Sequence, residues 1–210
     1  MSEHHDHDHD HAHEPTAEDR ARALESLLVE KGLITTEAID AYLAHLESDV
    51  GPLRGARVVA RAWIDEDFKV RLLTDAPAAM RELGIDAGAL QLIVVESTPQ
   101  VHNVVCCTLC SCYPWRVLGL PPSWYKSPAY RSRIVIDPRG VLREFGCELD
   151  EGVEVRVWDS TSECRYMVLP ERPAGTEGMT EEELVALVTR DSLVGVTRLG
   201  LPQAAGPVSV

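Results

Sequence analysis

The chain has 210 residues, a formal net charge of −14 and an apolar content of 45%, which fits one domain, or one domain with an arm, around a real hydrophobic core. The acidic balance argues against a nucleic-acid partner, because the summed field would repel a phosphate backbone. There is no apolar run of about 18 residues, which excludes a membrane span, and there is no apolar segment typical of a secretory signal, so we expect a cytoplasmic protein.

The N-terminal part of the chain predicts a tail followed by a helical arm. Residues 1–15 alternate histidine and aspartate, and such a run is predicted to be disordered because it buries no core. The arm is predicted at residues 16–52. Its first helix has Thr16 as N-cap and ends at Gly32, and its second stops at Gly51-Pro52. Each helix carries a narrow apolar stripe, so we expect the arm to pack on another surface.

The main domain is predicted at residues 53–200 and begins with helices. The apolar patterns predict three helices and then a buried strand rich in β-branched residues. These elements are expected at 53–63, 66–73, 76–83 and 90–96.

Beyond the central cysteines the sequence predicts more helices and two strands. Ser127-Pro128 and Asp137-Pro138 are N-cap and N1 pairs of two helices. Strands are expected at 153–159 and 164–170, joined by a short hairpin-like connection. A capping box of Thr180 and Glu183 begins a last helix that is expected to run to about Arg190, and residues 201–210 are predicted to be loose. These elements predict an α+β fold in which a layered α-β-β-α domain carries the cysteine loop.

Four of the six cysteines fall within seven residues, at 106, 107, 110 and 112. A disulfide framework spreads its cysteines, so this cluster indicates metal or redox chemistry. Cys107, Cys110 and Cys112 form a C-x-x-C-x-C set, and its tight C-x-C step brings the amides of Ser111 and Cys112 close to any metal. A highly charged ion could take three sulfurs and two deprotonated nitrogens, which leaves the open position of a catalytic site.

Other interpretations of the cysteines remain open on spacing alone. A structural zinc site or a Cys₄ iron–sulfur cluster needs a fourth ligand. A set of inert buried thiols is a third alternative. The histidine-rich tail could collect divalent metal weakly, or bind it only incidentally. The candidates for a fourth ligand, none at regular spacing, are Cys106, Cys147, Cys164 and His102.

The segment CTLCSCYPW, followed by LGLPPSWY, resembles the α subunit of nitrile hydratase. The resemblance extends over most of the chain from about residue 20 to 200. The metal-binding γ subunit of thiocyanate hydrolase shares the CxLCSC element. Further matching segments are GPLRGARVVARAW, YRSRIVIDPRGVL, VEVRVWDSTSE, RYMVLPERPAGTEG and VTRDSLVGV.

The resemblance implies a ligand set and a metal. Cys107 would be the axial thiolate, and Cys110 and Cys112 would be equatorial and oxidised to sulfinic and sulfenic acid. The amide nitrogens of Ser111 and Cys112 would complete the protein ligands. Thr108 and Tyr113 match the cobalt type, which implies one low-spin Co(III) per α subunit rather than Fe(III).

The resemblance also implies roles for residues around the metal and for other proteins. Trp115 would line the substrate pocket, or else be an ordinary core aromatic. Glu163 and Arg165 would support the site and the subunit interface, or else form an ordinary surface ion pair. The partner would be a β subunit, in a heterodimer or a heterotetramer, whose arginines hold the oxidised sulfurs. The arm would wrap this partner, and an activator or metallochaperone could insert the cobalt.

The implied reaction is the hydration of small nitriles to amides by a lyase. The metal would polarise the nitrile or lower the pKa of water, or the sulfenate oxygen of Cys112 would attack the nitrile carbon. One alternative is the γ subunit of thiocyanate hydrolase. Trp115 and the segment LGLPP match nitrile hydratase instead and argue against this alternative. Another is a metal-storage or chaperone-like binding protein. Three departures from the family pattern put substrate range in doubt: Cys106 for Val, Arg116 for Pro and Met179 for Trp.

Overall fold

A computed structural model of the protein describes residues 15–200. The predictions for residues 1–14 and for residues 201–210 therefore lie outside the described residues. The chain divides into two compact units, with the boundary between Ala44 and His45. Within the described part, every helix is too short or too polar to cross a membrane.

The first unit contains two helices with little apolar burial. α1 (Ala17–Glu30) begins at the predicted N-cap, where Thr16 and Asp19 form a capping box. α2 (Thr36–His45) follows, and neither helix contains a buried residue. Leu24 and Leu27 are 57% and 45% exposed, so the stripe of α1 is left largely uncovered.

The second unit begins with four helical segments, of which the last three lie at the positions predicted from the apolar pattern, whereas the first was predicted as the end of the second arm helix. η1 (Leu46–Val50) is a π-helical turn, and α3 (Leu53–Ile64) follows it. α3 buries small residues, and Gly55 faces the side chains of Leu118 and Leu193 so closely that a Cβ there would collide with them. The next two helices are α4 (Glu66–Thr74) and α5 (Ala76–Glu82).

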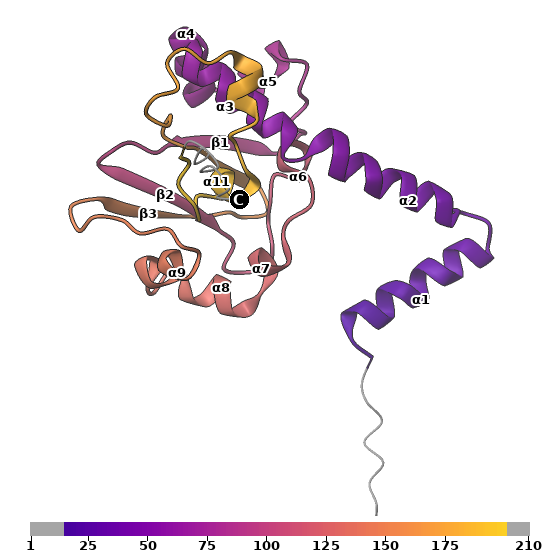
Figure 1. The fold of residues 1–210 in the computed structure, drawn as a ribbon. Helices are drawn as coiled ribbons and strands as arrows, with labels where there is room; N and C mark the ends of the chain where they lie inside the picture. Colours follow the sequence, from indigo (N-terminus) through magenta and orange to yellow (C-terminus); the bar gives the residue numbers. More distant parts are fainter. Residues whose placement is uncertain (1–14, 201–210) are drawn as a thin grey trace, which may run out of the picture. The chain divides into compact units, whose positions relative to one another are not determined.

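Two pairs of parallel strands form the middle of this unit (Figure 1). β1 (Gln91–Glu96) pairs with β4 (Cys164–Leu169), and β2 (Val101–Cys106) pairs with β3 (Glu154–Asp159). The predicted hairpin between the last two strands is wrong, because each of them instead pairs with a strand far upstream. Parallel pairing needs such long crossovers and aligns the carboxyl ends of both strands. Cys106 therefore lies opposite Asp159.

Short helices cover the strands on both sides, with α3 to α5 on one side and α7 to α9 on the other (Figure 1). The predicted caps Ser127 and Asp137 begin two of them, and the mixed helix and strand layers confirm the predicted fold class. These helices are α6 (Trp115–Leu118), α7 (Ser123–Lys126), α8 (Pro128–Arg133) and α9 (Pro138–Glu144).

The single last helix that the sequence predicts is two helices in the structure. The capping box at Thr180 begins α10 (Glu181–Val185), which ends at Ala186 rather than near Arg190. A second capping box at Thr189 then begins α11 (Arg190–Val194). A new N-cap interrupts the helix because its side chain satisfies the first free amides of the next one.

Candidate metal centre

The cysteine loop begins where β2 ends and brings three sulfurs together. The Sγ atoms of Cys107 and Cys110 are 3.6 Å apart, those of Cys110 and Cys112 are 3.2 Å apart, and all three lie within 4.8 Å of one another. Cys107 is buried, Cys110 is exposed and Cys112 is half-buried. The three cysteines that the spacing singled out therefore form one cluster.

The donor atoms of this loop fit a transition-metal ion. Thiolates are soft ligands, which favour transition metals over magnesium or calcium. The N–H of Cys110 donates to the sulfur of Cys107 at 3.3 Å. The backbone amides of Ser111 and Cys112 help to lower the pKa of Cys110.

The electrostatics of the loop favour a first deprotonation at Cys110. Its pKa is lowered to about 7, chiefly because the Cys112 thiol donates a hydrogen bond to it, and also because backbone amides do. Burial raises the pKa of Cys112 to about 12, and the nearby charge of Arg165 works against this effect. A bound cation would favour loss of the remaining thiol protons.

The other cysteines lie outside the three-sulfur cluster. Cys106 is fully buried, and burial raises its pKa to about 12. Cys147 is buried, with its sulfur 3.9 Å from Nε2 of His102, and Cys164 begins β4. Within residues 15–200 no fourth sulfur or imidazole completes a zinc or iron–sulfur set around the cluster.

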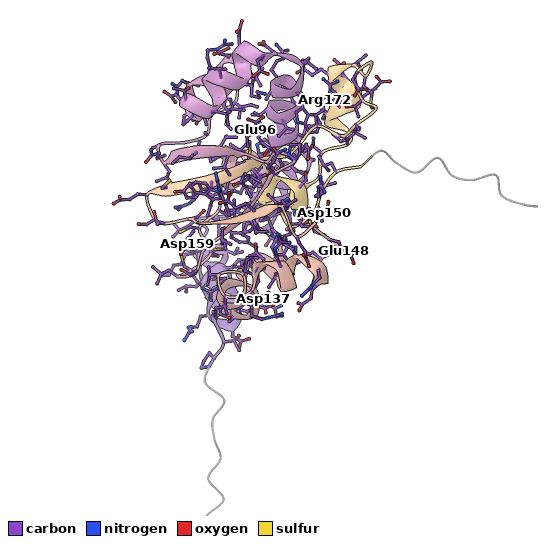
Figure 2. All side chains as sticks on the ribbon, turned by 90° about the vertical axis from the view of Figure 1, so that its left-hand side faces the viewer. Glu96, Asp137, Glu148, Asp150, Asp159 and Arg172 are labelled. Carbon is purple, nitrogen blue, oxygen red and sulfur yellow. The ribbon has the colours of Figure 1, made fainter. Side chains whose placement is uncertain are left out.

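Four hydrogen bonds from three residues outside the loop hold it near its ends. Asp159, labelled in Figure 2, accepts from the backbone N–H of Thr108 at 2.9 Å and from its hydroxyl at 2.5 Å. The hydroxyl of Tyr125 donates to the carbonyl of Cys112 at 2.8 Å, and that of Tyr130 donates to the carbonyl of Val105 at 2.7 Å. The sequence predictions missed Asp159, Tyr125 and Tyr130.

The tyrosines near the loop belong to a cluster of aromatic rings. The rings of Tyr113 and Tyr125 meet edge-on with centroids 5.1 Å apart, and Trp124 meets Tyr130 at 4.9 Å and Phe145 at 4.8 Å. Such edge-to-face pairs restrict ring orientation. The hydroxyls that hold the loop are therefore presented from a packed core.

A pocket of about 130 Å³ lies beside the loop and contains several predicted site residues. Trp115, 40% exposed at the start of α6, lines it together with Tyr113 and Arg165. Glu163 is exposed before β4, where its carbonyl accepts from the N–H of Gln91 at 3.1 Å. No ion pair joins Glu163 to Arg165 among the described side chains, so the ordinary surface pair is not formed.

Comparisons with known proteins agree with the geometry of this loop. The chain is 60% identical over 189 residues to the low-molecular weight cobalt-containing nitrile hydratase subunit alpha of Rhodococcus rhodochrous, covering 89% of this chain and 90% of that one. It is 41% identical over 186 residues to the thiocyanate hydrolase subunit gamma of Thiobacillus thioparus, covering 83% and 76%.

A solved structure shares the fold as well as the sequence. It is a double mutant of the Fe-type nitrile hydratase from Comamonas testosteroni, 45% identical, with a TM-score of 0.80 over 92% of this chain and 95% of that chain. The family model for the nitrile hydratase alpha chain matches residues 15–197. The cysteine loop therefore stands in a chain that belongs to the nitrile hydratase alpha-chain family.

Proposed function

We propose that this chain is the α subunit of a cobalt-dependent nitrile hydratase, which hydrates nitriles to amides in a complex with a β subunit. The observation that carries the proposal is the gathering of three sulfurs within 4.8 Å in one loop. The family supports the reaction, and the name of the relative at 60% identity supports cobalt.

The proposed ligand set follows from the loop and the resemblance. Cys107, Cys110 and Cys112 would hold the ion through sulfur, with Cys110 oxidised to sulfinic acid and Cys112 to sulfenic acid. The amide nitrogens of Ser111 and Cys112 complete the set. The effect of these two amides on the pKa of Cys110 supports this assignment.

When bound, a trivalent cobalt ion supplies Lewis acidity towards the nitrile or towards water. The residues of the chain supply positioning and charge. The oxidised sulfur of Cys112 places an oxygen beside the substrate, where it either takes a proton from the attacking water or attacks the nitrile carbon itself. Arg165 balances negative charge at this sulfur, in line with its electrostatic effect on Cys112. Trp115 provides an apolar wall that limits the water around the nitrile.

We propose that the helical arm, residues 16–52, packs on the β subunit, and that residues 53–200 form the catalytic domain. The support is the lack of buried residues in α1 and α2, whose leucines remain exposed. Amphipathic helices with an uncovered stripe are typical of surfaces that a partner covers. Deleting residues 16–44, the part of this arm that lies outside the second unit, would then weaken assembly with the β subunit.

Oxidised cysteines are expected in the active complex. The α subunit is co-expressed with its β subunit and cobalt, assayed for conversion of a nitrile to its amide, and digested for mass spectrometry of residues 106–116. Two added oxygens are expected on Cys110 and one on Cys112. An active complex that holds only zinc and three unmodified thiols contradicts the mechanism.

The same preparation separates the alternatives. The γ subunit of a thiocyanate hydrolase is favoured by the 41% identical relative, and it would make the complex hydrolyse thiocyanate and leave nitriles unchanged. A metal-storage protein would bind cobalt through residues 1–15, and its metal content would not depend on Cys107, Cys110 and Cys112. Nitrile hydration that requires these cysteines excludes both.

Tyr125→Phe is expected to weaken cobalt binding by about 3- to 10-fold, because it removes one hydrogen bond worth about 1 kcal/mol. The substitution keeps the ring contact with Tyr113 but loses the bond to the carbonyl of Cys112. Cobalt content after dialysis against a chelator measures the effect. Tyr42→Phe, at an exposed position in α2, is the matched control. Equal cobalt retention in both variants would show that Tyr125 does not position the loop.

A further inference from the structure

The pocket beside the cysteine loop has mostly apolar walls and two cationic side chains. The apolar walls come from the turn before β1, from β1 and from the end of the loop. One of these cations is Arg165, which lies on β4. The other cation is Arg116, the residue that departs from the family pattern. The lining residues used below are Gly88, Leu90, Leu92, Trp115, Arg116 and Arg165.

Two contacts hold the side chain of Arg116 in place, and a third contact fixes its carboxylate partner. Its guanidinium carbon lies 5.4 Å from the ring centroid of Trp115, within cation–π range. Its Nη1 lies 2.8 Å from Oδ2 of Asp86. The other oxygen of this carboxylate accepts from the N–H of Gly88 at 2.9 Å, so Asp86 joins the turn to the arginine.

Gly88 makes room for this arrangement. A Cβ at Gly88 would lie 2.9 Å from Cδ of Arg116, and the backbone there has φ +89°, which favours glycine. An exposed ion pair by itself contributes little. Here the ion pair acts together with the stacking on Trp115. The turn at Gly88 also leaves space for the aliphatic part of the Arg116 side chain. Arg116 therefore lines the pocket with one side of its side chain, while about half of that side chain (48%) stays exposed to solvent.

The size of the pocket decides which nitriles fit beside Arg116. An apolar cavity of roughly 150 Å³ accommodates benzene. The pocket is smaller, at about 130 Å³, and Arg116 already covers part of the indole of Trp115. This space favours a short aliphatic nitrile, because the ring of an aromatic nitrile would compete with Arg116 for the face of Trp115.

We propose that Arg116 is a specificity-determining residue, which Asp86 and Trp115 hold across the pocket so that short aliphatic nitriles are preferred over aromatic ones. This inference rests on the proposed nitrile hydratase function. It adds a substrate class to that function and assigns its selection to one side chain of this subunit.

The test compares kcat/KM for propionitrile and benzonitrile in the cobalt-loaded complex with the β subunit. Arg116→Ala is expected to raise the benzonitrile-to-propionitrile ratio about 10-fold, the lower end of what a change of pocket volume achieves. The change is expected as a lower KM for benzonitrile with little change in kcat, because Arg116 acts on substrate binding more than on the chemical step. Asp86→Asn, which loosens the arginine without removing it, should shift the ratio in the same direction by about 2-fold.

Arg133→Ala is the matched control, since Arg133 is a similarly exposed arginine paired with Glu144. It should leave the ratio unchanged. An unchanged ratio in Arg116→Ala, with cobalt content and melting temperature as in the parent, overturns the inference. If Arg116→Ala fails to assemble with the β subunit, the test relies on Asp86→Asn. An unchanged benzonitrile-to-propionitrile ratio in Asp86→Asn would then overturn the inference. A parent complex that holds cobalt and hydrates neither nitrile overturns the proposed function instead.

Discussion

Cys112→Ser is expected to abolish nitrile hydration by the cobalt-loaded complex. The substitution removes one of the three clustered sulfurs, and with it the oxidised sulfur that we place beside the substrate. Loss of a residue that only supports a metal ligand typically costs about 10- to 100-fold in affinity or activity. Loss of a ligand that also carries the reacting oxygen should cost more than about 100-fold, measured as kcat/KM together with cobalt content.

Cys147→Ser is the matched control for this experiment. Cys147 is buried, like Cys107, but its sulfur lies 3.9 Å from Nε2 of His102 and outside the three-sulfur cluster. Serine there places a hydroxyl in a buried site, so a lower melting temperature is expected while kcat/KM stays near that of the parent. An equal loss of activity in both variants would mean that the cysteines have been assigned wrongly.

The features predicted correctly from the sequence depend on residues that are close together in the chain. The caps at Thr16, Ser127, Asp137 and Thr180 are confirmed, because a capping side chain reaches amides only two or three positions away. The same holds for the cysteine cluster, where two short spacings were enough to predict that three sulfurs meet.

The errors concern contacts between distant parts of the chain. The sequence pattern predicts no element at β2, although its burial fits a strand in the interior of a parallel pair. Without β2, the alternating strand at 153–159 had no visible partner except its neighbour in sequence, which led to the wrong hairpin. Periodicity identifies a strand, but its pairing is set by packing that the sequence of one strand does not contain.

The residues that hold the loop were missed for the same reason. Asp159 stands 51 positions after Thr108, and Tyr125 stands 13 positions after Cys112. A signal for Asp159 does exist, because it ends a strand just as Cys106 does. The carboxyl ends of parallel strands meet at one edge, so correct pairing of β2 with β3 would have placed this carboxylate beside the loop.

Asp159→Ala is expected to lower cobalt content and kcat/KM by about 10- to 100-fold, the range found when a group that orients metal ligands is lost. Its carboxylate accepts two hydrogen bonds from Thr108, the residue directly after the proposed metal ligand Cys107. Hydrogen bonds to a charged group contribute about 1.5–3 kcal/mol each, and removal leaves the Thr108 amide without its acceptor. Without this anchor the free loop is less ordered, so it loses more conformational entropy when metal binds.

A double-mutant cycle and a control in the same strand make this prediction specific. Thr108→Val removes only the hydroxyl, and combining it with Asp159→Ala should add little, because both changes break the same contact. Glu154→Ala, at the other end of β3, removes an exposed pair with Arg156 and should leave cobalt content unchanged. If Asp159→Ala keeps full cobalt content, or if Glu154→Ala loses as much, the carboxylate does not hold the loop for the metal.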